Sequence, residues 1–455
     1  MNRLVVLASV IVLGGCSLAP DYQRPAAPVP DQWSDADARP AAALDWRTFF
    51  PDPRLHGLIV AALEHNRDLR IAVARVEEAR ALYGIARADR LPTFNAAAGR
   101  SASRTPADLS MTGKAMTAQR YDADLAMPSF EVDFWGRVAS LSDAAKANYL
   151  ATDEARRAFR LSLITDVANA YLTVVEMQER QSVAADTVRT REETRAMVGK
   201  RREVGLAGDL DYLQADGAFQ SARADLANLT RQQAAAENAL RVLVGASPEL
   251  PAGRTLAEQA IVGDIPVGVP SEVLVNRPDV RAAEQSLLAA NANIGAARAA
   301  FLPRLLLTGA FGTASSALTG LFKAGQTAWT FQPALNMPLF DFGRTAANRD
   351  LAEARKNIAV AQYEKTIQQA FREVADLLAG RQTLADQLVA QEANEKAQTE
   401  RLRLVTARYE AGISSYLEVL DAQRDLFTAQ QGTLQTRRDL LATAAQFYKT
   451  LGNAD

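Results

Sequence analysis

Residues 84–92 read GIARADRLP, and residues 295–303 read GAARAAFLP, an offset of 211 (295 against 84). Further pairs follow in the same order along the chain, at a similar offset. They are FWGR at 134–137 with DFGR at 341–344, and EVGL at 203–206 with EAGI at 410–413. Self-similarity at a fixed spacing indicates a structural unit that occurs more than once. The chain is therefore predicted to contain two copies of one unit.

The repeat sets the predicted boundaries of the domains. The first copy covers residues 51–245 and the second covers residues 271–452. Residues 246–270 contain Pro248, Pro251, Pro266 and Pro270, and we interpret them as a linker between the copies. Because proline lacks the amide donor and resists both helix and sheet, such a segment is typical of a connection.

Each copy is predicted to begin with a helix that ends at a Leu-Pro pair, because proline disfavours helix for the residue before it. These helices cover about residues 53–89 and 271–300. Two extended segments follow in each copy. They are expected at about 92–103 and 120–135 in the first copy, and at about 303–313 and 327–341 in the second.

Apolar and polar residues alternate along the second strand of each pair. In the first copy Tyr121, Leu125 and Met127 share one parity, and Pro128 then shifts the phase. In the second copy Trp329, Phe331, Leu335, Met337 and Leu339 share one parity, with polar residues on the other. A period of two predicts β-strands with one apolar face and one polar face.

A long helix follows Gly136-Arg137 in one copy and Gly343-Arg344 in the other. Helical patterning runs to about 204 and 411 without an interior proline. A helix of roughly 68 residues would be about 100 Å long. A glycine-containing turn follows, and a second helix (209–245, 415–452) returns along the first. The narrow apolar stripe and high alanine content suit coiled-coil packing with neighbouring helices.

The start of the chain has the pattern of an exported protein. Residues 1–15 form a signal peptide with Arg3 before a short apolar core, too short to span a membrane. Residues 13–16 read LGGC and resemble a bacterial lipoprotein box, which makes Cys16 the lipidation site; an ordinary signal peptide with an incidental cysteine is the alternative. Ser17, where such lipoproteins carry Asp for inner-membrane retention, favours the outer membrane. Residues 16–50 are proline-containing and are predicted to form an extended tether.

Composition excludes several classes of function. The 51 Lys and Arg residues nearly balance the 53 Asp and Glu residues, which argues against a nucleic-acid partner. Two histidines and one cysteine provide no zinc-ligand cluster, and the motifs of metalloproteases, P-loop enzymes and serine hydrolases are absent from the sequence. We therefore predict no catalytic residue, no metal and no cofactor. Beyond the signal peptide no transmembrane helix is expected.

Four strands per chain cannot close a membrane barrel, for which about eight strands are the minimum. Two chains would supply eight strands and three would supply twelve. The alternative is a soluble β-sandwich attached to a coiled coil.

Four motifs together carry a family resemblance: DFWGR at 133–137, PLFDFGR at 338–344, RYEAG at 408–412 and YLEVLDAQR at 416–424. The chain resembles the TolC-type outer-membrane efflux proteins, nearest their lipoprotein, OprM-like branch. The resemblance implies a mainly helical fold with membrane β-structure: a homotrimer whose twelve-stranded barrel, surrounded by outer-membrane lipid, continues into a periplasmic barrel of helices. It also implies two partners, a periplasmic adaptor (membrane fusion protein) and an inner-membrane pump of the RND type.

Alternative functions remain open at this point. An exit duct for type I protein secretion or for metal efflux would use the same architecture. A periplasmic adaptor lipoprotein also carries a helical hairpin, but it has one hairpin where this chain has two.

In the family, residues beside the turn of the second hairpin close the periplasmic end. Asp421 is the strongest candidate for this gate. The other matching residues are Leu417, Glu418, Arg424 and Tyr409, with Leu210, Asp211 and Gln214 as first-copy counterparts. Glu418 also has the capping-box spacing to Ser415, which is the structural alternative. Arg424 is spaced to pair with Asp421 on one helix face. Because Gln214 replaces the acid, the second hairpin is predicted to form the tighter constriction.

Overall fold

The computed structural model describes residues 17–30, 45–259, 261 and 274–450. The chain divides into two compact units. Unit 1 consists of Met1–Ala26, Arg75–Asp153 and Ala282–Tyr363, and unit 2 consists of Ala27–Ala74, Glu154–Arg281 and Glu364–Asp455. Each unit therefore combines segments from both halves of the sequence. The signal peptide and Cys16 lie outside the described residues.

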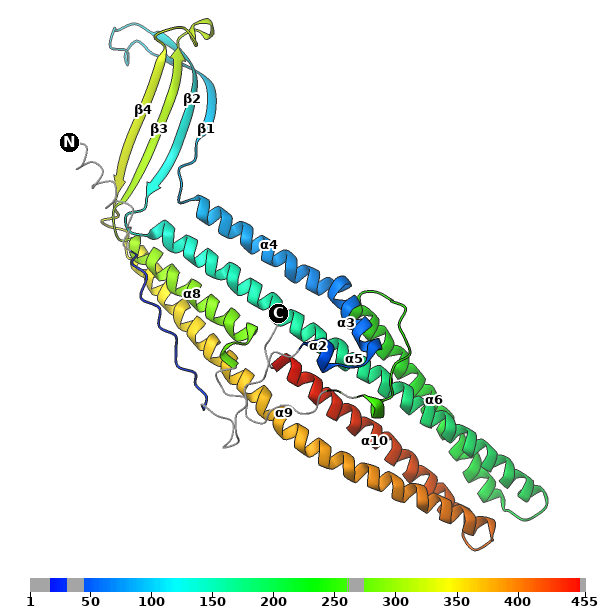
Figure 1. Cartoon of the computed structure of the whole chain (residues 1–455). Coiled ribbons are helices and arrows are strands. Elements are labelled where there is room, and N and C mark those ends of the chain that lie inside the picture. The colour runs from blue at the N-terminus through cyan, green and yellow to red at the C-terminus, as the bar shows by residue number, and fades with distance from the viewer. Residues whose placement is uncertain (1–16, 31–44, 260, 262–273, 451–455) are drawn as a thin grey trace. The chain divides into compact units, whose positions relative to one another are not determined.

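The same order of elements occurs twice along the chain (Figure 1). Helices α4 (Arg67–Ala88) and α8 (Pro278–Ala299) both have 22 residues. Helices α5 (Arg137–Glu203) and α9 (Arg344–Glu410) both have 67 residues, and α6 (Asp209–Val244) and α10 (Tyr416–Thr450) have 36 and 35. The described residues also include two short 3-10 helices, η1 (Leu256–Glu258) and η2 (Leu318–Gly320).

The first predicted helix, about 53–89, is interrupted. It consists of α3 (Pro53–His65) and α4, and Asn66 between them has an extended backbone with φ −60° and ψ 129°. The Asn66 side chain stabilises the break, since Oδ1 accepts from the Leu69 N–H at 2.8 Å and Nδ2 donates to the Leu243 carbonyl at 2.7 Å. An asparagine side chain that bonds nearby backbone competes with helix continuation.

The described part of the N-terminal segment contains a stretch without regular secondary structure that is docked on α8, and a short helix. In unit 1, residues 17–26 have no regular secondary structure, and Arg24 donates to Glu284 of α8 through Nε at 2.7 Å and Nη2 at 2.9 Å. In unit 2, α2 (Trp46–Phe49) lies within the predicted tether, and Trp46, Phe49 and Phe50 are buried. The prediction of an extended tether up to residue 50 is therefore wrong for this part, because three large aromatic side chains pack into the core.

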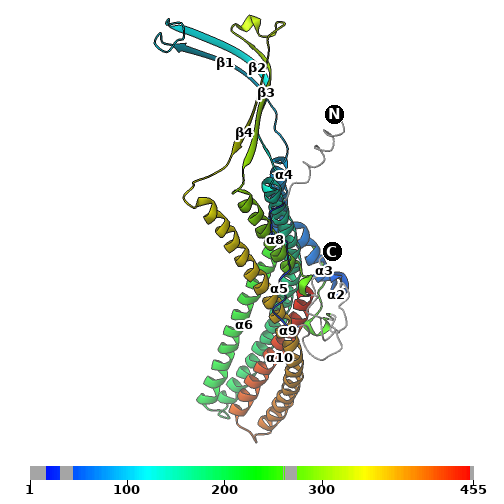
Figure 2. The same ribbon diagram turned by 90° about the vertical axis from the view of Figure 1, so that its left-hand side faces the viewer.

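Unit 1 contains one antiparallel sheet in the order β1-β2-β3-β4. Its strands are β1 (Asn95–Thr105), β2 (Met116–Val132), β3 (Arg304–Ser315) and β4 (Thr327–Asn336). Each edge strand, β1 and β4, pairs with a single neighbour within the described chain. The sheet is strongly twisted in Figure 2.

The pairing register gathers the apolar residues on one face. Phe311 lies opposite Leu125 on one side and Trp329 on the other. The register shifts between Met127 and Phe130, as the phase change at Pro128 indicated. Strand β4 ends at Asn336 instead of continuing to 341, close to Pro338, which has no N–H to donate to a ladder. Most side chains of the sheet are exposed, including Phe311, Trp329 and Phe331.

The main core of unit 2 forms where α5 packs against α2 and α3. Leu163, Ile164 and Leu172 of α5 are buried there with Phe50 and Ile59. In the described part of the chain, α5 is the one helix long and apolar enough to cross a membrane, which differs from the expectation of no such segment. More than half of its apolar window is buried inside the protein, so this core accounts for the apolar composition.

Candidate functional site at the hairpin turns

Both long hairpins reverse direction through the same turn, and the turns lie at the same end of unit 2 (Figure 2). Gly205 has φ +74° and Gly412 has φ +76°, a left-handed conformation that favours glycine. Two backbone bonds close each helix end in a Schellman pattern. At the first turn the Gly205 N–H donates to the Arg202 carbonyl (3.0 Å) and the Leu206 N–H to the Arg201 carbonyl (2.7 Å). At the second turn the Gly412 N–H donates to the Tyr409 carbonyl (3.0 Å) and the Ile413 N–H to the Arg408 carbonyl (2.9 Å).

A small apolar cluster holds the two turns together. Val198 and Ala215 of the first hairpin are buried against Tyr416 and Val419 of the second. Tyr409 packs on this cluster, with its ring centroid 5.6 Å from that of Tyr416. Burial raises the pKa of Tyr416 to about 12, so its phenol is neutral at physiological pH. The structure thus places the predicted residue Tyr409 between the hairpins.

Glu418 and its first-copy counterpart Asp211 both cap a helix. The Ser415 N–H donates to Glu418 Oε1 at 3.3 Å, which is the second half of a capping box. The Gly208 N–H donates to Asp211 Oδ2 at 3.2 Å in the same manner. The capping alternative from the sequence is therefore present for Glu418, and its carboxylate is engaged at the start of α10.

Asp421 lies in a chain of ion pairs. Arg424 Nη2 is 3.2 Å from Asp421 Oδ1 and 3.4 Å from Asp425 Oδ1. Arg401 of α9 contacts Asp425 Oδ2 at 2.6 Å, and this hydrogen bond holds the pKa of Asp425 below its usual range. The Asp421 side chain is 40% exposed. Hence the expected pair of Asp421 and Arg424 is present, with its acid still accessible to solvent.

Sequence reasoning missed Arg401 and Asp425. A usable signal was present, because the two residues lie at equal sequence distances on either side of Ile413. In an antiparallel hairpin such residues face each other. About the first turn, Arg195 and Asp216 lie 11 and 10 residues on either side of Leu206, the counterpart of Ile413, and Arg195 Nε lies 2.7 Å from Asp216 Oδ1.

Large apolar side chains are exposed around both turns. Leu417 is 53% exposed and its counterpart Leu210 is 67% exposed, whereas Gln214 is half-buried. Val204, Leu206 and Ile413, which were not singled out from the sequence, are also exposed beside them. Contiguous exposed apolar residues are a feature of interaction sites or of pores.

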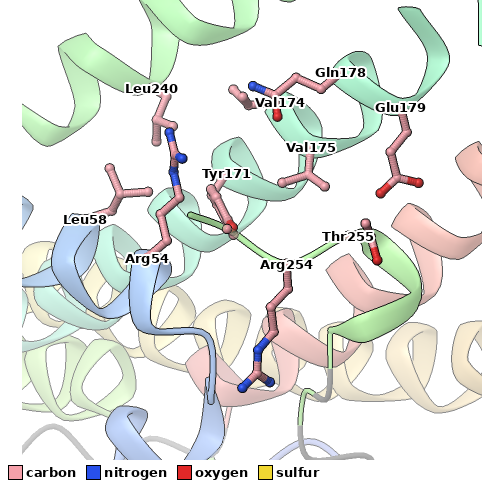
Figure 3. A pocket seen from close by; sticks show the side chains of 11 residues that line it. Arg54, Leu58, Tyr171, Val174, Val175, Gln178, Glu179, Leu240, Arg254 and Thr255 are labelled. Atoms are coloured by element: carbon pink, nitrogen blue, oxygen red, sulfur yellow. The ribbon is translucent and has the colours of Figure 1, made fainter. Parts of the chain in front are cut away.

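A second feature of unit 2 is a cavity of about 180 Å³ beside α3, α5 and the segment Gly253–Thr255 (Figure 3). Buried Asp52 accepts hydrogen bonds from the Tyr171 hydroxyl at 2.8 Å and Gln259 Nε2 at 2.7 Å. Burial alone would raise the pKa of Asp52, but these bonds and backbone donors lower it below its ordinary value. The polar groups here anchor the linker to α5.

The described residues contain no group of three or more His, Cys, Asp or Glu side chains placed to hold a metal ion. Among the described residues, the clearest functional character belongs to the pair of hairpin turns, with apolar and acidic side chains at their ends, and to the sheet, most of whose side chains are exposed. This combination agrees with the outer-membrane efflux class that the sequence motifs indicated.

Comparison with known proteins gives the same class. The model of the outer membrane efflux protein family matches residues 58–246 and 269–453, and the chain belongs to this family. It is 44% identical to outer membrane protein OprJ of Pseudomonas aeruginosa over 456 residues, covering 98% of this chain and 94% of OprJ. It is also 44% identical to the solvent efflux pump outer membrane protein SrpC of Pseudomonas putida over 459 residues, covering 98% and 96%.

A solved structure is similar over nearly the whole chain. The open state of the MtrE outer membrane channel of Neisseria gonorrhoeae is 38% identical, with a TM-score of 0.86. The match covers 96% of this chain and 98% of that one.

Proposed function

We propose that the protein is the outer-membrane channel of a tripartite efflux system, in which a periplasmic adaptor and an inner-membrane pump of the RND type deliver the substrate. Passage through the channel is passive, and no enzymatic activity is proposed. The name of SrpC concerns solvent efflux, which supports small apolar compounds as substrates here. An exit duct for secreted proteins or metals is less well supported by these relatives.

The observation that carries this proposal is the sheet, in which, within the described residues, each edge strand pairs with a single neighbour and most side chains are exposed. An exposed edge strand presents unpaired N–H and C=O groups, which a membrane cannot satisfy. Three copies, with β4 of each pairing with β1 of the next, would close a barrel of twelve strands. The apolar face with Phe311 and Trp329 would then contact lipid. Three sets of paired hairpins would form the periplasmic tunnel.

Within that trimer the turns of α9 and α10 form the gate. Three copies of Leu417 narrow the pore, and three copies of Asp421 place negative charge in it. Exposure of Leu417 in a single chain supports this role, as does the accessible carboxylate of Asp421. The ion pair with Arg424 partly offsets the negative charge of Asp421, whereas Glu418 caps the start of α10.

Gene deletion tests the proposed function. Loss of the gene is expected to increase sensitivity to organic solvents and hydrophobic antibiotics, with resistance restored by the intact gene. The protein should migrate in outer-membrane fractions as a trimer that heating dissociates. A deletion strain with unchanged sensitivity to every compound class, or a protein found only in the soluble periplasm, would contradict the proposal.

The anchor gives a separate prediction. We propose that Cys16 is lipidated and that the docked segment after it, held by Arg24 and Glu284, carries the anchor. Cys16→Ser is expected to abolish metabolic labelling with a palmitate analogue, whereas Ser17→Ala should retain the label. Labelling that persists in Cys16→Ser would show that the acyl chain is attached to a residue other than Cys16, which would contradict the proposal.

A further inference from the structure

The pairing register assigns the residues of the sheet to two faces. Directly opposed residues of antiparallel strands share a face, and so do alternate residues along one strand. Leu125, Phe311 and Trp329 lie opposite one another on three adjacent strands. Their side of the sheet, called here the aromatic face, is the side that contacts lipid in the proposed barrel.

Two arginines of β1 lie on the aromatic face. Arg100 is opposite Tyr121, and Arg104 is opposite Thr117. The contacts of Arg100 agree with this side, because its Cζ lies 5.6 Å from the centroid of the Tyr121 ring and its Nη2 donates to Gln119 Oε1 at 3.4 Å. Both arginines are exposed, so the aromatic face carries two accessible cations.

Within the four described strands, the aromatic face has no acidic residue to balance these cations. Asp122 and Asp124 of β2 have the other parity, and Asp122 pairs on that opposite face with Arg120 at 3.4 Å. Glu131 follows the register shift in β2 and lies opposite Leu306, which is also on the opposite face. The charge of the aromatic face is therefore positive.

An open apolar groove of about 360 Å³ lies on the aromatic face. It is lined by large apolar side chains around one glycine, among them Leu125, Met127, Phe311 and Trp329 around Gly309. The glycine leaves this space open, since a Cβ on it would lie 3.8 Å from the Phe331 ring and 4.0 Å from Met127 Cε. An apolar groove that faces a bilayer suits a hydrocarbon chain.

The arginines and the groove are arranged like the two ends of a lipid. Tyr121, opposite Arg100, is four residues from Leu125 at the groove (121 against 125), which is roughly 13 Å along the strand. Arg100 and Arg104 lie on the side of the turn that joins β1 to β2, away from the strand ends that connect to α4 and α5. In the proposed channel the helices are periplasmic, so this side of the sheet is in the outer leaflet.

The chemistry of arginine identifies the headgroup. An arginine that faces lipid is destabilising at the middle of the bilayer and is tolerated near the interface, where the headgroups lie. A planar guanidinium binds phosphate with two parallel hydrogen bonds. The contact of Arg100 with Gln119 uses one of its five N–H groups.

We propose that the aromatic face binds a phosphate-bearing, acylated lipid of the outer leaflet, an inference that rests on the proposed outer-membrane function. The lipid phosphate contacts Arg100 and Arg104, and one acyl chain lies in the groove at Gly309. Free phosphate has no chain for the groove, and a neutral lipid has no anion for the arginines. Because the lipid binds the folded sheet, it stabilises that sheet by mass action.

The test is titration of the full-length protein in detergent with fluorescently labelled lipid A, beside the same lipid without its phosphates and beside inorganic phosphate as a competitor. The phosphorylated lipid is expected to bind saturably. The lipid without phosphates should bind about tenfold more weakly, the loss expected for a hydrogen bond to a charged group. Equal binding of the two lipids would overturn the proposal. Displacement by inorganic phosphate at the concentration of the lipid would assign the site to the free anion and would also overturn it.

A matched pair of arginine variants isolates the headgroup contact. Arg100→Gln combined with Arg104→Gln should weaken binding of the phosphorylated lipid at least about tenfold. Arg120→Gln is the control, because Arg120 lies opposite Ser101, next to Arg100 along the sheet but on the opposite face. All three side chains are exposed, so these variants should fold. Undiminished binding in the double variant, or an equal loss in the control, would refute the headgroup contact.

A second variant tests the groove. Gly309→Val places a side chain in the groove, and the nearest neighbour of its Cβ, the Thr330 carbonyl oxygen at 3.4 Å, is at an ordinary contact distance. By displacing about two methylene groups of the acyl chain, it should weaken binding of both lipids about tenfold. Unchanged binding in Gly309→Val would refute the seat for the acyl chain.

The location of the protein separates this inference from the proposed function. A trimer in outer-membrane fractions that shows no preference for the phosphorylated lipid would overturn the lipid site and leave the channel function standing. A protein that is absent from the outer membrane would contradict the proposed function and, with it, the role of this lipid.

Discussion

Replacing Leu417 and Asp421 together by alanine is expected to raise the single-channel conductance of the protein in planar bilayers several-fold and to weaken its preference for cations. Apolar rings narrow a pore and acidic rings favour cations, so the two changes act on different properties of the same constriction. Leu417→Ala alone should therefore change the conductance more than the cation preference, and Asp421→Ala alone should change the cation preference more than the conductance.

The structure makes this experiment interpretable. Leu417 is 53% exposed, so its truncation creates no cavity, and surface substitutions of this kind change stability by about 0.5 kcal/mol or less. When Asp421 is removed, Arg424 still has Asp425 as a partner. A larger conductance would then report an opened gate and not an unfolded hairpin.

The duplicated chain supplies a matched control. Leu210→Ala with Gln214→Ala alters the same positions of the first hairpin, and this variant should change conductance much less. Wild-type conductance and cation preference in the Leu417→Ala, Asp421→Ala protein would remove both residues from the gate. Equal effects in both hairpins would instead reject the second hairpin as the tighter constriction.

The largest expected effect on stability comes from Asp52→Ala. This substitution leaves the Tyr171 hydroxyl and Gln259 amide without their acceptor, and hydrogen bonds to a charged group contribute about 1.5–3 kcal/mol each. It also removes the cap of α3, because Asp52 accepts from the Arg54 N–H at 2.8 Å. A loss of about 3 kcal/mol or more is expected, measured by denaturant unfolding or by hydrogen exchange of the linker. Tyr171→Phe, which removes one of these bonds, should cost less.

The same network predicts the pH dependence of stability. Because the pKa of Asp52 is lower in the folded protein than in the unfolded chain, the unfolded state binds the proton more readily. The stabilisation is fully present above the ordinary aspartate value of about 3.9 and is lost as the pH falls through the lower folded value. In Asp52→Ala the stability should fall less steeply at acidic pH than in the wild type. An unchanged pH dependence would show that other carboxylates determine the loss of stability at low pH.

Patterns of short range in the sequence predicted much of the architecture. The alternation around Tyr121–Met127 and the phase change at Pro128 correspond to β2 and its register shift. Glycine at the two turns marked the left-handed positions Gly205 and Gly412. The break at Asn66 escaped detection, because the helical pattern is continuous there and the stabilising contact comes from the distant Leu243 carbonyl.

At the candidate site the sequence predicted residues near the second turn, but it did not predict the residues that they contact on other helices. The pair of Asp421 and Arg424 lies on one helix face, so its spacing is visible along the chain. Arg401 reaches Asp425 across the hairpin, and Tyr409 contacts Tyr416 in a cluster that also needs Val198. Such contacts depend on how helices are rotated against each other.

The sequence by itself determined the duplicated order of elements, the two faces of the strands, the turn positions and the family. Each of these rests on local periodicity, on glycine at the turns, or on short motifs that can be read along a single chain. Only the tertiary structure decided that each compact unit mixes both copies, and that the 119-residue gap between Asp52 and Tyr171 closes into one buried network. The reason is physical. Burial and the presence or absence of a partner are properties of packing between distant segments, and no spacing along the chain encodes them directly.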